Sequence, residues 1–306
     1  MSIRDINGNL YMGFIFHSGL YSFFAYDDMK SVDKRTIQNG SEWYLSKLNN
    51  DRGEKINPTR LYHQNFGINF DYFRAKFHIS RESICDWLDI CVKCKATFAV
   101  ITAKHHDSYC LWNTNTTDKK SRNDIVQIFK EECIKRNLQF CIYYSWMEFE
   151  SPMTIDYFTN TCIPQITELL QYGPSSFWFD GDWVIKTKTI ITYINQIVSL
   201  IISMGISVND RITSDNQYLS TYKVGPNRYF PKEYTQNWQH IDTIGISWGY
   251  NKFQKEEHYK NGKQLLDMYN KTTSLGGVLL LNIGPKHDGT LDENELNSLN
   301  EFIDLL

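Results

Sequence analysis

Residues 176–181 read Ser-Phe-Trp-Phe-Asp-Gly, a short apolar run that ends in the acidic residue Asp180. In a closed barrel of parallel strands, the chemistry lies at the carboxyl ends of the strands. If this run is such a strand, Asp180 stands where a reacting carboxylate would stand, and Trp178 points to the same side of the strand. Taken alone, the stretch is better explained as an ordinary strand that stops at an Asp-Gly turn.

Six further apolar runs end in polar or aromatic residues in the same way. They span residues 12–16, 98–103, 139–142, 206–208, 244–247 and 278–281. Most segments between the runs carry apolar residues three or four positions apart, as helices do. Such stripes cover residues 84–92, 190–201 and 265–272, and Ser80 is suited to cap the first of them. The alternation predicts a parallel sheet and an α/β fold.

The length of 306 residues fits one (β/α)8 barrel domain over residues 1–306, with loop insertions. The eighth strand is expected either in residues 39–72 or in residues 212–238. A plausible last helix covers residues 294–306, and we expect no β-sandwich after the barrel.

Composition excludes several classes of protein. The net charge of −3 comes from mixed signs without a basic stripe, so we expect no nucleic-acid partner. No apolar run approaches the length of a membrane span. The first residues lack the charged start and apolar core of a secretory signal, and the seven cysteines suit a reducing compartment. The sequence therefore predicts a cytoplasmic protein, or a secreted one if a leader was removed.

The residues at the strand ends predict a sugar ligand. They comprise three histidines, a carboxylate, an arginine, a tyrosine and several tryptophans. Aromatic faces together with neutral imidazoles suit a small polyhydroxylated ligand that also has an apolar face. A metal site is not expected, because the adjacent His105 and His106 should point to opposite sides and no His-x-His accompanies them. The Cys91–Cys94 pair sits on a predicted helix without a second pair, which disfavours zinc.

The chain resembles the α-L-fucosidases of glycoside hydrolase family 29 from Gly13 to about Phe302. The most specific piece is Thr-Ala-Lys-His-His-Asp-Ser-Tyr-Cys-Leu-Trp at residues 102–112. Weaker pieces follow in the order of the family at residues 13–22 (Gly-Phe-Ile-Phe-His-Ser-Gly-Leu-Tyr-Ser), 42–44 (Glu-Trp-Tyr), 143–145 (Tyr-Tyr-Ser), 178–181 (Trp-Phe-Asp-Gly), 208–211 (Val-Asn-Asp-Arg), 247–251 (Ser-Trp-Gly-Tyr-Asn) and 280–285 (Leu-Leu-Asn-Ile-Gly-Pro).

The resemblance implies a retaining glycosidase that acts on terminal α-L-fucose, without a cofactor or metal. Asp180 matches the nucleophile, which would form a covalent glycosyl-enzyme. Arg211 matches a residue that keeps Asp180 ionised, although the two could also form an ordinary structural pair. The residues that match positions gripping the fucose hydroxyls are His17, Glu42, Trp43, His105, His106 and Tyr143. Trp178 and Trp248 match aromatic walls, with core packing as their alternative.

The sequence departs from the family at the proton donor. One branch carries this acid directly before a tyrosine, where this chain has Thr221, and other members have it after a tryptophan, where this chain has Gln239. Neither side chain is an efficient general acid. Three acidic residues could substitute for it, and of these we favour the first: Glu233, Asp215 and Asp182.

Two functions of different classes follow. The first is an active α-L-fucosidase with an acid from an unusual position. The second is a pseudoenzyme that binds fucose and has lost turnover. A glycosidase of altered sugar preference is a third, weaker alternative. Oligomeric state and the natural glycan are not predicted.

Overall fold

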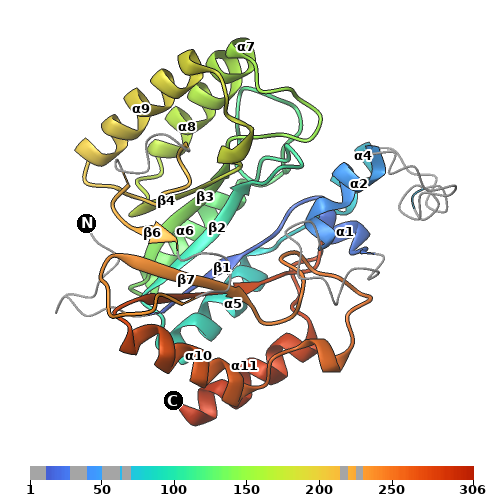
Figure 1. The fold of residues 1–306 in the computed structure, drawn as a ribbon. Helices are drawn as coiled ribbons and strands as arrows, with labels where there is room; N and C mark the ends of the chain where they lie inside the picture. Colours follow the sequence, from blue (N-terminus) through green and yellow to red (C-terminus); the bar gives the residue numbers. More distant parts are fainter. Residues whose placement is uncertain (1–11, 28–39, 50–62, 64–69, 214–219, 225–229) are drawn as a thin grey trace, which may run out of the picture.

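All strand pairs of the computed structural model are parallel (Figure 1). The structure describes residues 12–27, 40–49, 63, 70–213, 220–224 and 230–306. Eight strands form one sheet in the order β5-β4-β3-β2-β1-β8-β7-β6. They are β1 (Gly13–Phe16), β2 (Phe98–Lys104), β3 (Gln139–Ser145), β4 (Ser176–Asp180), β5 (Ser207–Val208), β6 (Lys223–Val224), β7 (Trp238–Thr243) and β8 (Val278–Ile283).

The first and last strands pair with each other, with Gly13 opposite Leu280, as in a closed barrel. Between β5 and β6, side chains take the place of a ladder. The main-chain N–H of Thr221 donates to the carbonyl of Val208 at 2.9 Å, and the Thr221 Oγ1 accepts from the N–H of Val208 at 2.9 Å. The predicted (β/α)8 barrel is confirmed, and so is the placement of the eighth strand in residues 212–238, as β6.

The longer helices lie outside the barrel. Helices α8 and α9 lie on one side of it and α10 and α11 on the opposite side (Figure 1). The helices are α1 (Tyr21–Phe24), α2 (Tyr44–Asn49), α4 (Phe70–Lys76), α5 (Arg81–Lys93), α6 (Ile125–Lys135), α7 (Ile155–Tyr157), α8 (Ile163–Leu170), α9 (Lys188–Ser203), α10 (Gly262–Ser274) and α11 (Glu293–Leu305). Shorter 3₁₀ or π turns are η1 (Ser41–Trp43), η2 (Phe158–Cys162), η3 (Asp182–Val184) and η5 (Glu256–His258).

The helices predicted from the apolar stripes are confirmed. The Ser80 hydroxyl accepts the N–H of Ser83 at 3.1 Å and caps α5, and the stripes at residues 190–201 and 265–272 lie in α9 and α10. Cys91 and Cys94 are both buried as free thiols. Burial raises the pKa of both, which leaves them protonated.

One predicted strand is wrong. Residues 244–247 are not a strand, and β7 is the preceding stretch Trp238–Thr243. The sequence of β7 looks polar, yet all six residues are buried because their polar groups find partners inside the fold. The more apolar stretch after it turns, since the Thr243 hydroxyl donates to the carbonyl of Gly245 and the N–H of Ile246 donates to Gln254.

Two apolar layers follow from the alternation of side chains along each strand. Residues facing into the barrel form a small cluster that includes Ile15, Val100, Tyr143, Trp178 and Leu280. The intervening residues face the helices and belong to a larger outer core. The polar residues at the strand ends lie directly above this inner cluster, at the mouth of the barrel.

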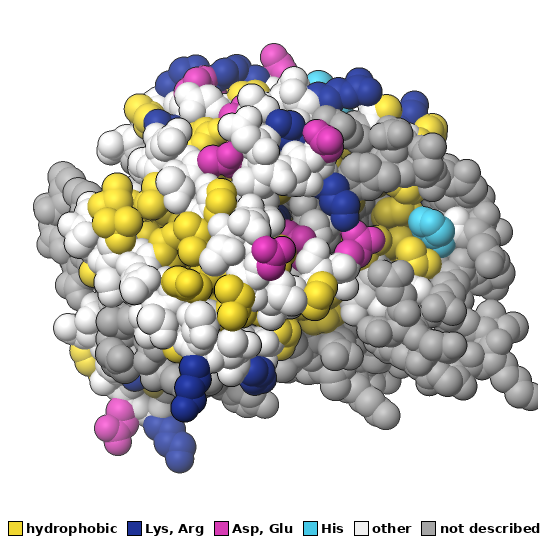
Figure 2. Space-filling view, turned by 90° about the horizontal axis from the view of Figure 1, so that it is seen from above, with side chains coloured by type: hydrophobic (Ala, Val, Ile, Leu, Met, Phe, Trp, Pro, Cys, Tyr) yellow, Lys and Arg dark blue, Asp and Glu magenta, His cyan; other side chains and the backbone are white. Residues whose placement is uncertain are grey.

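The outer surface mixes both signs of charge. Figure 2 shows lysines and arginines interspersed with acidic and hydrophobic side chains over one face. Among the described residues, no helix is long and apolar enough to cross a membrane.

Candidate active site

Asp180 ends β4 and receives hydrogen bonds from two neighbouring strand ends. The register pairs Tyr143 of β3 with Trp178, and the Tyr143 hydroxyl donates to Asp180 Oδ2 at 2.8 Å. Arg211, which follows β5, donates from Nη1 to Oδ1 at 2.8 Å. Gly181 has a φ of 80°, a backbone conformation that favours glycine, and it turns the chain away directly after the carboxylate. Both carboxylate oxygens are therefore held in place.

The surroundings of Asp180 keep it ionised. Burial alone raises the pKa of this carboxyl, but the charge of Arg211, the nearby His106 and the hydrogen bond from Tyr143 together lower it below its usual range. Burial also raises the pKa of Tyr143 well above its usual value, so its hydroxyl keeps the proton that it donates. The predicted pairing of Asp180 with Arg211 is present, and it gives an anion at the barrel mouth.

Three neutral imidazoles lie next to this anion. The ring centres of His17 and His105 are 5.4 Å apart, and those of His105 and His106 are 4.2 Å apart. Burial lowers the pKa of His17 and of His106 to about 4, and that of His105 further below its usual value. His106 Nδ1 bonds the Ser145 hydroxyl at 2.6 Å, while its Nε2 lies 3.7 Å from Asp180 Oδ2. At neutral pH these rings offer hydrogen bonds without net charge.

The expectation that His105 and His106 point to opposite sides is wrong. Strand alternation ends at Lys104, and His106 already lies in a turn. The register of β2 on β3 also shifts, from Thr102 opposite Tyr143 to Lys104 opposite Tyr144. This bulge directs Lys104 away from the barrel interior and leaves both imidazoles at the mouth.

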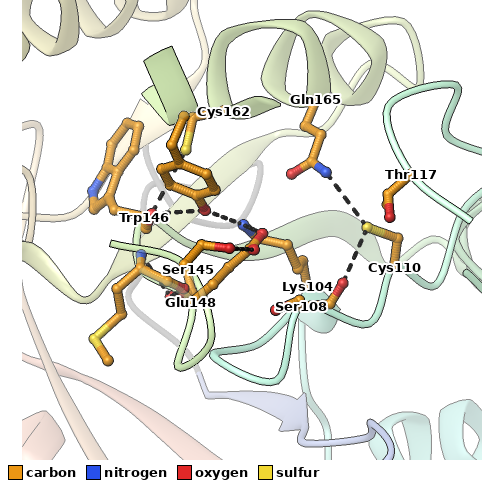
Figure 3. Close-up of polar contacts among 12 residues, drawn as sticks. Lys104, Ser108, Cys110, Thr117, Ser145, Trp146, Glu148, Cys162 and Gln165 are labelled. Carbon is orange, nitrogen blue, oxygen red and sulfur yellow. Dashed lines mark hydrogen bonds and ion pairs between the residues drawn. The ribbon is translucent and has the colours of Figure 1, made fainter. Parts of the chain in front are cut away.

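Lys104 is buried behind the histidines, in the cluster shown in Figure 3. Its ammonium contacts Glu148 Oε1 at 2.9 Å and the Tyr157 hydroxyl at 3.0 Å. It also lies 4.5 Å from the ring centre of Tyr144. Burial alone opposes the charge of Lys104, but Glu148 more than compensates and raises its pKa. This ion pair fastens the segment after β3 to the end of β2.

Glu42 and Trp248 lie together on the other side of the histidines. Glu42, in η1, accepts the N–H of Gly249 at 3.2 Å through Oε2, while its Oε1 is buried without a partner among the described residues. Burial raises the pKa of Glu42 to about 7. The ring centre of Trp248 lies 5.4 Å from that of His17.

Trp43 and Trp178 flank the pocket at different depths. The ring centre of Trp43 lies 5.6 Å from that of His106. Trp178 is buried and stacks on Tyr143 with 5.5 Å between ring centres. Trp178 therefore packs in the inner core, which is the alternative to an aromatic wall that the sequence analysis gave for this residue.

The two expected acid positions have structural partners in this chain. Gln239, the second residue of β7, accepts the indole N–H of Trp178 at 2.9 Å through Oε1. Thr221 holds β5 to β6, as described above. Neither supplies a titrating proton.

Glu233 is not brought to the site, contrary to our preference for it as the acid. It is exposed and precedes β7, and its neighbour Thr235 donates its N–H to the carbonyl of Leu275, before β8 begins. It therefore lies at the amino ends of the strands, roughly 15–20 Å of strand length from Asp180. Asp215 lies outside the described residues. Asp182 is half-buried and lies two residues after Asp180, and burial, followed by the charge of Asp180, raises its pKa.

A metal could be considered at His105, His106 and Asp180, whose potential ligand atoms lie within 4.8 Å of one another. Both oxygens of Asp180 already accept hydrogen bonds, and one of these comes from the cation Arg211. A second cation on the same carboxylate would be repelled by the guanidinium. The donor set therefore fits a carboxylate kept for chemistry better than a metal ligand.

Four residues at the mouth are not among the predicted site residues. Ser145 and Asn282 stand at strand ends that the sequence marks, in the pieces at residues 143–145 and 280–285, but the prediction assigns them no role. Asn282 Nδ2 donates to the carbonyl of Trp248 at 2.6 Å and fixes the backbone of that tryptophan. Phe149 lies in the irregular segment after β3 and Trp183 lies in η3 after β4, and no periodicity marks either of them.

Comparisons with known proteins identify the family of the chain. The family model described as alpha-L-fucosidase matches residues 8–306. The alpha-L-fucosidase of Dictyostelium discoideum is 27% identical over 320 residues, which cover 95% of this chain and 67% of the relative. The tissue alpha-L-fucosidase of Bos taurus is 26% identical, over 82% of this chain and 59% of the relative.

A solved structure agrees with the sequence relatives. The alpha-fucosidase of Thermotoga maritima in complex with fucose is 26% identical, has a TM-score of 0.76, and is matched over 96% of this chain and 71% of its own. The chain spans 67% and 59% of the length of the two curated relatives. Since the family model covers nearly all residues, this chain belongs to the alpha-L-fucosidase family.

Proposed function

We propose that this protein is an α-L-fucosidase that releases terminal α-L-fucose from glycans with retention of configuration, and that Asp180 is its nucleophile. The observation that carries the proposal is the buried, ionised Asp180 carboxylate, whose two oxygens are held by Tyr143 and Arg211. Membership of the family and the fucose complex of the Thermotoga relative support the choice of sugar.

The reaction proceeds in two steps. One oxygen of Asp180 attacks the anomeric carbon, the bond from that carbon to the leaving oxygen breaks, and the leaving oxygen takes a proton from the general acid. Water then attacks the fucosyl-enzyme ester, gives a proton to the same residue, and releases Asp180. Two inversions give net retention. Tyr143 and Arg211 fix the angle of attack and keep the carboxylate charged between turnovers.

The pocket beside Asp180 provides the groups that a deoxyhexose needs. The imidazoles of His17, His105 and His106 are neutral and can donate to or accept from ring hydroxyls. Glu42 brings a buried oxygen without a partner among the described residues, which a sugar hydroxyl would satisfy. Aromatic faces such as that of Trp248 suit the methyl group that distinguishes fucose from a fully hydroxylated hexose.

We propose further that the proton donor is a carboxyl whose pKa lies above its usual range, as general acid catalysis near neutral pH requires. Several described carboxyls meet this condition, and we take Glu42 and Asp182 as the candidates. Glu42 has a buried oxygen without a partner among the described residues, and Asp182 lies two residues from Asp180. The carboxylates of Asp107 and Asp210 already accept main-chain N–H groups. Glu42 is the stronger candidate because burial raises its pKa to about 7, so it carries a proton over much of the neutral range.

Product stereochemistry tests the reaction. Hydrolysis of an activated aryl α-L-fucoside, followed by proton NMR from the first seconds, should release α-fucose before mutarotation. Release of β-fucose first would rule out Asp180 as a nucleophile in a retaining mechanism. Binding of fucose without hydrolysis of the aryl substrate would instead indicate the pseudoenzyme.

Leaving-group dependence separates the two acids. Glu42→Gln and Asp182→Asn are each assayed on a dinitrophenyl fucoside, which needs little protonation, and on a methyl fucoside, which needs it fully. The variant that removes the acid should lose about 10²–10⁴-fold on the methyl glycoside and much less on the aryl one. Equal losses on both substrates would assign that residue to sugar binding rather than to proton transfer.

A further inference from the structure

Three partly exposed aromatic side chains surround His106 at the barrel mouth. The ring centres of Trp43, Phe149 and Trp183 lie 5.6, 5.4 and 5.7 Å from that of His106, with interplanar angles of 61°, 72° and 85°. Trp43 comes from η1, Phe149 from the segment after β3, and Trp183 from η3 after β4. Three separate connections therefore place aromatic rings around one buried imidazole. We call Trp43, Phe149 and Trp183 the aromatic rim.

Phe149 is held in place by the buried network behind the histidines. Its main-chain N–H donates to the carbonyl of His106 at 2.8 Å. The residue before it, Glu148, is fastened by Lys104 and also accepts from the Ser151 hydroxyl at 3.1 Å (Figure 3). The ring centre of Phe149 lies 5.1 Å from that of Trp43. The ring position is thus built into the fold.

Trp183 is the unusual member of the rim. Its side chain is 39% exposed although it lies three residues after the buried Asp180. Within the described part of the chain, no hydrogen bond engages its indole N–H. A large exposed apolar ring is ordinary when it stands alone, but this one packs against His106, and the same imidazole also contacts the two other partly exposed rings, Trp43 and Phe149. A clustered apolar surface of this kind marks a ligand site more often than a scattered one does.

We propose that the aromatic rim is the subsite for the leaving group, and that it accepts a flat ring with an apolar face, either a pyranose or an aryl group. This inference rests on the proposed function, in which the fucosyl unit occupies the buried pocket. The group attached to the anomeric oxygen must then extend toward solvent past the rim, where aromatic faces can stack on it and the indole N–H can donate to a hydroxyl. Substrates whose leaving group is a ring are therefore favoured over those with a small alkyl group.

Binding measurements test the subsite without turnover. The Asp180→Asn protein is titrated by calorimetry with methyl α-L-fucoside and with phenyl α-L-fucoside, which differ only in the leaving group. We expect the phenyl glycoside to bind roughly tenfold more tightly, a difference within reach of one aromatic contact and its buried area. Adding Trp183→Ala should remove most of this preference and leave the methyl glycoside within about twofold of its former affinity. Adding Trp183→Phe should keep it.

The controls separate a failure of the proposed subsite from a failure of the proposed function. Tyr234→Ala removes another exposed aromatic side chain, 62% exposed at the opposite end of the barrel, and should change neither affinity. Methyl fucoside binding with no phenyl preference, or with a preference that survives Trp183→Ala, would overturn the subsite and leave the proposed function standing. A protein that binds neither glycoside would overturn the proposed function, and the subsite with it.

Discussion

The two sides of the barrel are built differently. Strands β1 to β4 have four to seven residues and pair along their length, with one bulge before Lys104. Their ends carry His17, the His105–His106 pair, Tyr143 and Asp180. Strands β5 and β6 have two residues each and depend on side chains for their connection. Besides the bonds of Thr221, Asp210 Oδ1 accepts the N–H of Val224 at 2.9 Å.

This difference in strand pairing explains why a nucleophile can be proposed from the structure while the general acid is harder to assign. On the β1 to β4 side, strand pairing fixes Asp180 and the side chains proposed to bind the sugar together. On the β5 to β6 side, the positions where the family resemblance places the acid are occupied by Thr221 and Gln239, which bond their neighbours instead. We expect the first side to be sensitive in catalysis and the second to be sensitive mainly in stability.

The largest effect is expected from Asp180→Asn. The variant keeps the shape of the side chain and an acceptor oxygen for Arg211, while its Nδ2 can only donate toward the Tyr143 hydroxyl. It lacks the attacking anion, so kcat on an aryl fucoside should fall by roughly 10⁴-fold or more. Fucose affinity and thermal midpoint serve as controls and should change little. An aryl-fucoside rate within tenfold of the parent would show that the β4 side does not supply the nucleophile.

Lys104→Met should give the largest loss of stability. It leaves Glu148 buried without its cation, which typically costs about 3–5 kcal/mol. Urea unfolding measures the change. The matched control is Lys119→Ala, which breaks an exposed pair with Glu150 and should cost less than about 1 kcal/mol. Similar costs for the two variants would contradict a buried ion pair behind the histidines.

Glu42→Gln should change the pH dependence of stability. In the folded protein Glu42 keeps its proton up to a pKa of about 7, whereas in the unfolded chain it ionises near its ordinary pKa of 4.5. Unfolding then releases a proton between these values, so the parent should lose stability relative to the variant as pH rises from 4.5 to 7. Outside this window the difference should be constant. Thermal midpoints at half-unit steps measure it, and a flat difference would mean that Glu42 has an ordinary pKa.

The smallest effect is expected from Thr221→Val at the β5 to β6 connection. The variant keeps the volume and loses the hydroxyl that bonds Val208, so the free energy of unfolding should fall by about 1–2 kcal/mol. Thr192→Val removes a comparable hydroxyl from the exposed face of α9 and is the control. Unchanged stability in Thr221→Val, or a loss of catalysis far beyond the loss of stability, would assign Thr221 a different role.

Much of the fold could be predicted because apolar runs and helical stripes alternate along the chain. The strand Trp238–Thr243 could not, since its sequence looks polar and Gln239 finds its partner, Trp178, 61 residues away in the chain. The bulge before Lys104 was equally hidden, and with it the shared orientation of His105 and His106.

The site residues also fall into those that the sequence predicts and those that only the folded chain reveals. Strand-end residues and the family resemblance pointed to Asp180, Tyr143 and Arg211, which the fold brings into contact. Glu233 was misplaced because closeness in sequence to β7 does not tell which end of the barrel a residue occupies. Trp183 and Phe149 carry no periodic signal, and their meeting at His106 is a property of the folded chain.

The central claim is that Asp180 attacks the sugar, and covalent trapping tests it most directly. Incubation with 2-deoxy-2-fluoro-α-L-fucosyl fluoride should slow the second step more than the first and leave the sugar attached. We predict that peptide mass spectrometry finds one fluorofucosyl group, on Asp180. A label on another carboxylate, or no label on a protein that still binds fucose, would contradict the account.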